Sequence, residues 1–164
     1  MDQEAVRGPG GRCVETTAAR HMRDLDRAEA LRLLSTVPLG RIVFTHHALP
    51  AVRPVNHFVS GGDIVIRIHE DGALGALVAH SDAPGVVVAY EADVIDSVTH
   101  LGWSVVVTGY ARVVADADEV DRYAHLLRPW VTYPMTGVLR IRSDLVTGFR
   151  LEGDPTRPVP AVRS

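Results

Sequence analysis

The sequence contains no lysine, and it contains only one asparagine and one cysteine among its 164 residues. Its seventeen cationic residues are therefore all arginine. Without lysine the chain has no amine side chain to form a Schiff base, which excludes catalysis through an internal aldimine. Cys13 stands alone in a glycine-containing stretch, so we expect neither an intramolecular disulfide nor a thiolate metal cluster.

Long hydrophobic runs and a strong charge of one sign are also missing. No apolar run approaches the roughly 20 residues that a membrane-spanning helix needs, and the N-terminal residues lack the apolar segment of a signal peptide. The net charge is −3 and the arginines are scattered along the chain, so we expect no concentrated positive charge that would attract a polyanion. We therefore expect a cytoplasmic protein that binds neither membranes nor nucleic acid.

The eight histidines show no spacing that is typical of a metal site. His46 and His47 are adjacent, so on a strand they point to opposite faces. The others lack the i,i+4 or cysteine-flanked spacing of zinc ligands, and we predict no metal. Phosphate-binding loops, dinucleotide fingerprints and nucleophile elbows are missing too. If the protein is an enzyme, a bound cofactor has to carry the chemistry.

The pattern predicts a single folded domain over residues 24–152. Residues 1–23 are polar and aperiodic, and we interpret them as a disordered N-terminal leader. Residues 153–164 contain three prolines and are expected to form an irregular tail. A chain of this length is about one domain, with enough residues for a real core.

Caps and periodicity predict two helices and a third short one. Asp26 begins the first helix, with Glu29 as its capping-box partner, and Pro38 ends it. Residues 116–127 form the second, and residues 72–80 add one or two turns. Strands are expected over 39–45, 51–59, 63–68, 85–91, 103–114, 138–142 and 146–151. The short connections favour a mainly β (α+β) fold, a six- to seven-stranded antiparallel barrel with two or three short helices.

The most informative stretch is Arg53-Pro54-Val55-Asn56, in the second predicted strand. Pro54 cannot donate to a ladder, so this strand should lie at a sheet edge or an irregularity. Side chains alternate along a strand, which places Arg53, Val55 and His57 on one face and Pro54 and Asn56 on the other. An arginine fork beside an amide suits a planar polar ligand that carries a phosphate. A hairpin whose arginine points to solvent is the alternative.

A second segment of interest begins the long strand over residues 103–114. Trp103 either seals one end of a barrel or contacts a ligand. Ser104 is small and polar enough to bond a ring edge, and equally enough to cap the start of the strand. Gly109 interrupts the same strand, which indicates a bulge or a sharp bend there.

Four motifs occur together in chain order: Arg53-Pro54-Val55-Asn56, then residues 62–67, 102–109 and 140–148. Their combination resembles the pyridoxamine 5′-phosphate oxidase-like, FMN-binding split-barrel superfamily, nearest its nitroimidazole-resistance branch. The resemblance covers about residues 25–151. It implies a homodimer with FMN in a groove between the subunits.

The resemblance also implies a set of site residues. Carried across, the flavin-binding residues are Arg53, Pro54, Val55, Asn56, Arg67, Trp103, Ser104, Arg140 and Arg142. Arg67 would approach the phosphate, and His57 is the one side chain that could donate a proton. After the position of Arg67, members of this superfamily usually have a serine or threonine and a lysine that bind the phosphate. Residues 68–74 of this chain have none of these and carry two carboxylates, which repel a phosphate.

Two main functions follow from these observations. The first is an FMN-dependent oxidoreductase that reduces a small planar acceptor, nitroaromatic compounds included. The alternative is a binding or sensing module without turnover that holds a flavin, a deazaflavin or haem on the same barrel. A structural dimer with an empty groove is a third reading. Analogy at the level of the fold does not decide among them.

Overall fold

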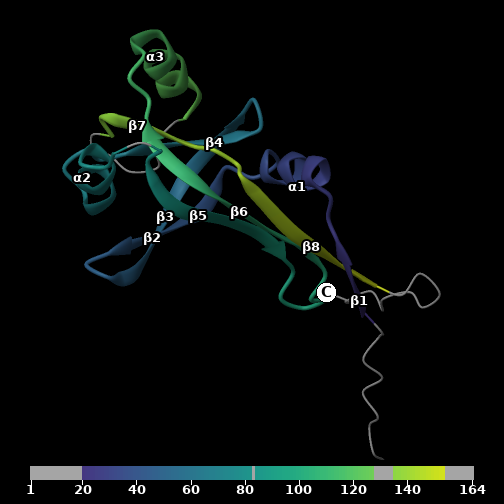
Figure 1. Cartoon of the computed structure of the whole chain (residues 1–164). Helices are drawn as coiled ribbons and strands as arrows, with labels where there is room; N and C mark the ends of the chain where they lie inside the picture. The colour runs from purple at the N-terminus through teal and green to yellow at the C-terminus, as the bar shows by residue number, and fades with distance from the viewer. Residues whose placement is uncertain (1–19, 83, 128–134, 154–164) are drawn as a thin grey trace, which may run out of the picture.

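The computed structural model describes residues 20–82, 84–127 and 135–153. Within these ranges the chain forms eight strands and three helices (Figure 1). The elements are β1 (Arg20–Asp24), α1 (Arg27–Leu34), β2 (Leu39–His46), β3 (Leu49–Ser60), β4 (Asp63–Ile68), α2 (Ala73–Ala79), β5 (Val86–Ile95), β6 (Gly102–Val113), α3 (Ala117–Leu126), β7 (Gly137–Ile141) and β8 (Leu145–Gly153).

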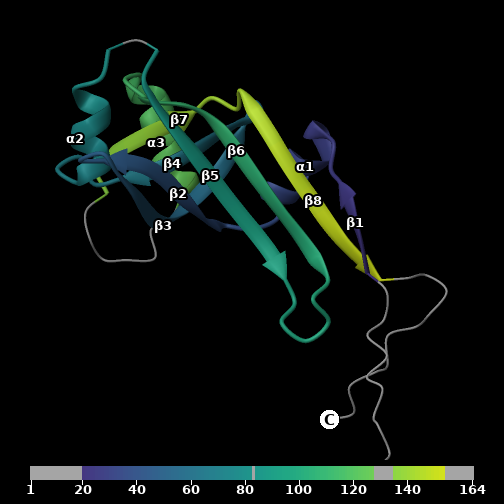
Figure 2. The ribbon, with the colours of Figure 1, turned by 60° about the horizontal axis from the view of Figure 1, so that its bottom comes forward.

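Six of the strands form an antiparallel barrel in the order β6-β5-β2-β3-β4-β7, and the pairing of β7 with β6 closes it. β8 extends the sheet from the other side of β6, and β1 pairs with β8 as the outermost strand (Figure 2). The predicted mainly β architecture, with a six-stranded antiparallel barrel and three short helices, is confirmed. The two strands outside the barrel raise the total above the expected six or seven.

β6 changes its partner strand around Gly109. Up to Thr108 it pairs with β8, and from Ala111 onward it pairs with β7. A Cβ on Gly109 would overlap the carbonyl oxygen of Arg142. The register between β6 and β5 runs through this position without interruption, so the expected bulge is not there. The glycine is required because two backbones approach closely where the barrel splits.

Side chains alternate between a packed interior and an outer face along the barrel strands. Fully buried interior residues are Ile42, Ile64, Ile66, Tyr90, Val105, Val107, Leu139 and Ile141. Leu33 and Leu34 of α1 and Leu74 and Val78 of α2 join the same cluster. A second cluster lies outside the barrel, beneath α3, and consists of Val65, Val114, Tyr123, Leu127 and Val138. α1 and α2 therefore pack on the interior, whereas α3 covers the outer face of β4 and β7.

The predicted start of the first helix is confirmed. The Asp26 carboxylate accepts a hydrogen bond from the backbone N–H of Glu29 at 2.8 Å, which satisfies one of the free N–H groups of the first turn. The Glu29 carboxylate receives two hydrogen bonds from Arg23. α1 thus begins with a side-chain cap and is tied to β1.

Residues 20–23 correct the predicted boundary of the disordered leader, because they belong to β1. Every side chain of β1 is exposed, so the apolar alternation that marks a strand in sequence is missing. Backbone pairing with β8 from Arg20↔Gly153 to Asp24↔Phe149 holds the strand in place. Residues 1–19 of the predicted leader and 154–164 of the predicted tail lie outside the described residues.

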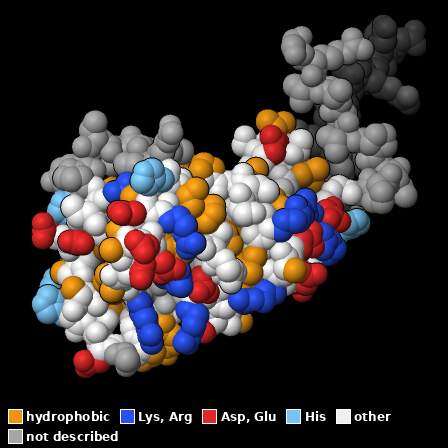
Figure 3. Space-filling view, turned by 90° about the horizontal axis from the view of Figure 1, so that it is seen from above, with side chains coloured by type: hydrophobic (Ala, Val, Ile, Leu, Met, Phe, Trp, Pro, Cys, Tyr) orange, Lys and Arg blue, Asp and Glu red, His pale blue; other side chains and the backbone are white. Residues whose placement is uncertain are grey.

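Three features of the described residues concern the predictions about nucleic acid, membranes and metals. On the face shown in Figure 3, acidic and arginine side chains lie interspersed. Among the helices that the structure describes, none has the length and apolar character needed to cross a membrane. The described residues contain no group of three or more His, Cys, Asp or Glu side chains placed to hold a metal ion. The cytoplasmic location stays a prediction.

Candidate functional site

The first half of β3 has a strand partner on one side only. β2 pairs with residues 49–56 of β3, whereas β4 pairs with residues 57–60 alone. Pro54 lies in the one-sided part, opposite Arg41, so its predicted place at a sheet edge is confirmed. Along residues 49–56, one edge of the backbone therefore has no ladder partner among the described strands.

The strand register divides the arginine–asparagine motif between two faces. Arg53 lies opposite Ile42, whose side chain is fully buried, so Arg53 is on the inner side. By alternation, the inner set is Arg53, Val55 and His57, and the outer set is Pro54 and Asn56. A ligand that contacts both sets has to lie along the free edge, where β4 no longer pairs with β3.

Two hollows near the start of β2 both have Val37 and Pro38 in their walls. The larger has a volume of about 320 Å³ and is lined in addition by Leu39, Gly40, Arg41, Pro54 and Asp93. The smaller, of about 260 Å³, is lined by Ser35, Thr36, His57, Phe58 and Val59. The larger hollow falls at the low end of the size range of small-molecule sites.

Arg41 holds two carboxylates together on the wall of the larger hollow. Its Nη1 donates to Glu91 Oε2 at 3.1 Å and to Asp93 Oδ1 at 3.0 Å. Burial raises the pKa of the Glu91 carboxyl, and the hydrogen bond from Arg41 opposes this effect. Because one cation serves two acids, this wall does not present a free positive charge to a phosphate.

Arg53 is the cation at the edge that is not paired with an acid. Its side chain is exposed, and Nη1 donates to the carbonyl oxygen of the preceding Val52 at 2.8 Å. No described carboxylate forms an ion pair with it. The guanidinium fork can therefore bind an anionic group of a ligand at this edge.

His57 is buried, and both of its ring nitrogens are engaged. Nε2 donates to the carbonyl oxygen of Leu34 at 2.8 Å, and Nδ1 accepts from the Tyr90 hydroxyl at 2.7 Å. Burial lowers the pKa of His57, although the hydrogen bond to Leu34 opposes the shift. These contacts favour a neutral ring that holds α1 to the barrel. Its role as a proton donor stays a prediction, and the geometry does not favour it.

Arg67 follows Ile66, the residue of β4 that pairs with His57, and it lies on the opposite face of the strand. Its Nη1 donates to the carbonyl oxygen of Leu127 at 3.5 Å, and Nη2 donates to that of Met135. Nε is buried and has no hydrogen-bond partner among the described residues. Arg67 thus binds the backbone around α3 and β7, and its predicted contact with a phosphate is untested.

Arg140 belongs to a polar cluster beneath α3. Its Nη2 donates to Glu119 Oε1 at 2.9 Å and to the Tyr123 hydroxyl at 2.8 Å. The Tyr123 hydroxyl also accepts a hydrogen bond from Arg122 Nη2 and donates one to Ser60 Oγ. Burial raises the pKa of Tyr123, but its hydrogen bonds with Ser60 and the two arginines outweigh this, so the pKa is lowered. The cluster fixes α3 on the barrel.

The remaining predicted site residues lie in three different environments. Trp103 is 6% exposed and belongs to the interior cluster. Its sealing of a barrel end and its contact with a ligand both stay predictions. Ser104 faces outward opposite Asp93, next to the larger hollow. Arg142 donates to Asp144 at 2.6 Å, and its guanidinium lies 5.3 Å from the centre of the Tyr110 ring. Of the three, only Ser104 is paired with a residue that lines the larger hollow.

Sequence reasoning missed four residues at this site: Arg41, Glu91, Asp93 and Tyr90. The signal for the carboxylates was their spacing, since Glu91 and Asp93 are two apart on a strand and share a face. The signal for Tyr90 was a polar aromatic within a valine-rich strand, which needs a hydrogen-bond partner when buried. Pairing each with its partner required the register of β2, β3 and β5.

The comparison with known proteins bears on the fold and the family. The family model described as pyridoxamine 5′-phosphate oxidase matches residues 26–150. The chain belongs to this family. The predicted split-barrel superfamily is thereby confirmed.

Several proteins resemble this member of the pyridoxamine 5′-phosphate oxidase family along most of its length. Uncharacterized protein Rv0080 of Mycobacterium tuberculosis is 47% identical over 150 residues, which are 92% of this chain and 99% of that protein. The structure of a candidate pyridoxamine 5′-phosphate oxidase from Corynebacterium glutamicum is 32% identical, with a TM-score of 0.65, and the match covers 79% of this chain and 92% of that one.

Two further solved structures bear on the predicted branch. An FAD-binding protein from Mycobacterium smegmatis is 29% identical, with a TM-score of 0.59, over 79% of this chain and 98% of that one. A candidate 5-nitroimidazole antibiotic resistance protein from Bacteroides thetaiotaomicron has a TM-score of 0.61 over 83% of this chain and 92% of that one. Its identity is 14%, so this likeness concerns the fold alone.

Proposed function

We propose that this protein binds a flavin nucleotide at the β3 edge and acts as a flavin-dependent oxidoreductase on a small planar acceptor. The observation that carries the proposal is the one-sided edge of residues 49–56, which bears Arg53, a cation that forms no ion pair with a described carboxylate. Pro54 of the same segment also lines the hollow of about 320 Å³. The name of the FAD-binding relative from Mycobacterium smegmatis supports a flavin as the ligand.

The residues at the edge fit the planar part of a flavin. A free strand edge offers main-chain donors and acceptors to the polar rim of a ring, and Pro54 adds an apolar surface. The chain offers fewer groups to the phosphate end of a flavin nucleotide. Arg67 is engaged by backbone carbonyls, and Glu70 and Asp71, which would repel a phosphate, are exposed after β4. Arg53 is the cation that remains for that end.

The chain's own residues would then bind and orient the cofactor. Arg53 would hold the phosphate, and the free backbone edge of Pro54–Asn56 would hold the ring. A bound flavin passes two electrons and a proton from a reduced co-substrate to an acceptor. His57 contributes by holding β3 in place, since its neutral ring is hydrogen bonded on both sides.

We further infer that the protein is a homodimer through the outer face of its longest strands. A row of outward residues crosses five strands in register: Val52, Val43, Ala89, Thr108 and Leu145. None of them belongs to either hydrophobic cluster, and Val52 and Leu145 are 48% and 58% exposed. An apolar face of this kind is typical of an interface between subunits.

The test of the flavin proposal is the absorbance spectrum of the purified protein, followed by titration with FMN, FAD, a deazaflavin and haem. A yellow protein, or saturable binding of a flavin, supports the proposal. Arg53→Gln should weaken flavin binding by about tenfold to a hundredfold, the scale of a charge-assisted hydrogen bond. Arg32→Gln, which removes an exposed arginine of α1, is the matched control and should change nothing.

A binding module without turnover is the second candidate function. The observation that favours it is the engagement of Arg67 together with the acidic residues after β4, which leave fewer groups to hold a phosphate firmly. Equilibrium binding without steady reduction of any acceptor by a nicotinamide or other reductant would support this candidate. A colourless protein that ignores every ligand of the panel would overturn both.

A further inference from the structure

The smaller hollow, of about 260 Å³, lies between the chain that follows α1 and residues 57–59 of β3. The pairing of β2 with β3 ends at Leu39↔Asn56, whereas β4 pairs with β3 from His57 onward. Beyond Asn56 the edge of β3 that had β2 as its partner therefore borders this hollow. It is the opposite edge from the one proposed to hold a flavin, which is free along residues 49–56.

The backbone of Val59 points toward the hollow. The His57 N–H donates to the carbonyl oxygen of Pro38 at 3.0 Å, so the backbone groups of His57 point away from β4. Bonded and non-bonded pairs alternate along an antiparallel ladder. Phe58 therefore exchanges both bonds with β4, and Val59 exchanges none. The N–H and C=O of Val59 lie on the same side of the strand as those of His57.

Pro38 leaves the carbonyl group of His57 without a donor. In a bonded antiparallel pair each residue donates to the other, but proline has no N–H and cannot return the bond that Pro38 receives. Within the described part of the chain, no other residue donates to this carbonyl oxygen or bonds the N–H or C=O of Val59. The edge therefore presents one free donor with a free acceptor on each side.

The two hydroxyl groups of the wall add further acceptors. The Ser35 hydroxyl donates to the carbonyl oxygen of Arg32 at 2.6 Å. The Thr36 hydroxyl donates to that of Leu33, also at 2.6 Å. A hydroxyl has one hydrogen, so toward a ligand each of them can only accept. None of the residues that line the hollow is an aspartate, a glutamate or an arginine. The hollow therefore suits a neutral ligand that carries an N–H donor.

Apolar side chains form the rest of the wall. Phe58 is 38% exposed and belongs to neither hydrophobic cluster, and Val37 and Pro38 line the same space. An aromatic ring among aliphatic side chains is a surface against which a planar ligand packs. A volume of about 260 Å³, just below the usual range of small-molecule sites, limits that ligand to a single ring.

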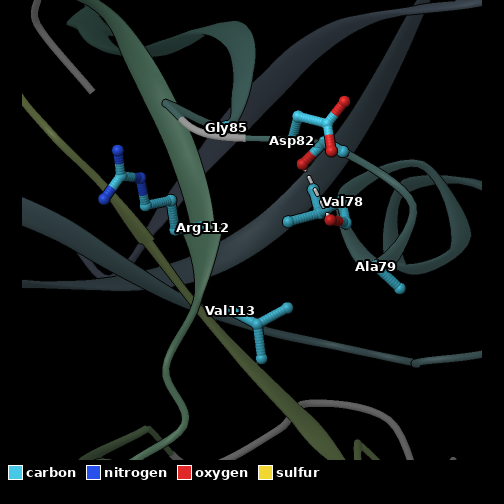
Figure 4. Close-up of a pocket in the computed structure, with 7 residues that line it drawn as sticks. Val78, Ala79, Asp82, Gly85, Arg112 and Val113 are labelled. Atoms are coloured by element: carbon cyan, nitrogen blue, oxygen red, sulfur yellow. Dashed lines mark hydrogen bonds between the residues drawn. The ribbon is translucent and has the colours of Figure 1, made fainter.

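A cavity of about 330 Å³ between α2 and β6 lacks such convergent polar groups (Figure 4). Its charged residues are Asp82 and Arg112, but the Arg112 guanidinium is directed away from the cavity, across β6 from Asp82. The Nε of Arg112 donates to the carbonyl oxygen of Pro84 instead. This cavity provides an internal reference for a binding experiment, because its residues Ser81 and Gly85 should not respond.

We propose that the hollow beside Val59 is a second small-molecule site, for a single neutral ring with a lactam edge. In such a ring an N–H group stands next to a carbonyl group, as in a pyridone or a pyrimidinedione. The ring N–H donates to the Val59 carbonyl oxygen, and the ring carbonyl accepts from the Val59 N–H. Phe58 contacts the ring itself.

The experiment is a ¹H–¹⁵N NMR titration of the full chain with three probes. 2-Pyridone has the lactam edge, N-methyl-2-pyridone keeps the carbonyl group but has no donor, and benzoate is an anion of similar size. We expect saturable shifts of the Val59 and Thr36 amides with 2-pyridone. N-methyl-2-pyridone should bind about threefold to tenfold more weakly, the scale of one neutral hydrogen bond. Benzoate should not shift these amides.

Hydrogen exchange tests the free edge without any ligand. The Val59 amide should exchange faster than the Phe58 amide, which is bonded to β4. Saturation with 2-pyridone should slow the exchange of Val59 and leave Phe58 unchanged. A Val59 amide that exchanges as slowly as Phe58 in the free protein would overturn the proposal.

Two variants and a control decide the assignment. Val59→Pro removes the donor at a position that takes no part in the ladder with β4, where proline is tolerated. It should weaken 2-pyridone by about threefold to tenfold, measured at the Thr36 amide. Phe58→Ala should weaken both pyridones. Val98→Ala, at a residue that is 68% exposed in the turn between β5 and β6, should bind the probes as the wild type does.

Equal affinities for the two pyridones, equal affinities in wild type and Phe58→Ala, or no saturable shift at Val59 would each contradict the assignment. The spectrum of every variant reports whether it is folded, and Phe58→Ala keeps the test decisive if Val59→Pro unfolds the chain. The outcome does not depend on flavin binding, because the flavin proposal concerns the other edge of β3, along residues 49–56.

Discussion

The Tyr90 hydroxyl donates a hydrogen bond to His57 Nδ1 at 2.7 Å across the interior of the barrel. Tyr90 is fully buried on β5 and His57 is 6% exposed on β3. The other ring nitrogen of His57 reaches the carbonyl oxygen of Leu34 at the end of α1. Two strands and a helix are therefore joined through one imidazole ring, immediately behind the free edge of β3.

Replacing Tyr90 by phenylalanine should destabilise the protein by about 1–3 kcal/mol. The substitution removes the donor and leaves His57 Nδ1 buried without a partner, which costs the desolvation of that atom. Chemical denaturation monitored by tryptophan fluorescence measures the loss. Tyr110→Phe is the matched control, because Tyr110 is half-buried on the outer face, and its stability should stay within about 0.5 kcal/mol of wild type. Equal effects of the two variants would contradict the assignment.

The stability of the protein should fall on acidification because of His57. Burial lowers its pKa in the folded state below the ordinary value of 6.5. Below pH 6.5 the unfolded chain binds a proton that the folded chain does not, so the free energy of unfolding decreases as the pH falls. The contribution of this group is complete above pH 6.5 and is lost below it, by at most about 1.4 kcal/mol per pH unit.

Denaturation midpoints between pH 8 and pH 5, for wild type and His57→Gln, measure this dependence. The variant should be less stable at pH 8 and should show a shallower slope below pH 6.5. The seven other histidines remain in both proteins, so their common contribution cancels. Parallel curves for the two proteins would rule out His57 as the source.

A charge on the outer face of β3 should weaken the proposed dimer. Val52 begins the row of outward residues and is 48% exposed. Val52→Arg would face its symmetry copy or apolar residues across the interface, which disfavours association by about tenfold or more. Sedimentation equilibrium over a range of concentrations detects the shift toward monomer.

Val98→Arg is the control for that experiment. Val98 is 68% exposed but lies in the turn between β5 and β6, away from the row. The control should keep the oligomeric state of the wild type. A wild-type protein that is monomeric at every concentration would remove the dimer from the proposal and leave the flavin site to its own test.

Gly109→Ala should prevent the barrel from closing normally. The new Cβ would overlap the carbonyl oxygen of Arg142, a backbone atom that cannot move without breaking the pairing of β6 and β7. We expect a loss on the order of 3 kcal/mol or failure to fold. Gly61→Asn is the control, because Gly61 has a φ of 60°, which asparagine tolerates, and no atom lies within 4 Å of a Cβ there. Thermal melts of both variants distinguish crowding at residue 109 from a general intolerance of glycine replacement.

Elements with a local signal could be predicted from the sequence. The Asp26 cap, the 63–68 strand and the edge at Pro54 each follow from a few adjacent residues, and the structure contains all three. β1 could not be predicted, because its side chains are all exposed and only backbone pairing with β8, over 120 residues away in the chain, makes it a strand.

The candidate site depends on partners that are distant in sequence. The division of the β3 side chains between two faces follows from the two-residue period of a strand, and the register with β2 confirms it. The Tyr90 partner of His57 lies 33 residues away, and the carbonyl acceptors of Arg67 lie 60 and 68 residues away. No periodicity encodes such contacts. They exist only once the barrel has brought the strands together.

The pairing of β1 with β8 also determines where the two ends of the described chain lie. Arg20 and Gly153 are directly opposed in this ladder, so the fold starts and finishes at one corner of the sheet. Joining these positions by a short flexible linker would give a circular permutant, opened at the exposed turn of His47 and Ala48 between β2 and β3. A reporter domain fused at either end would project from that same corner.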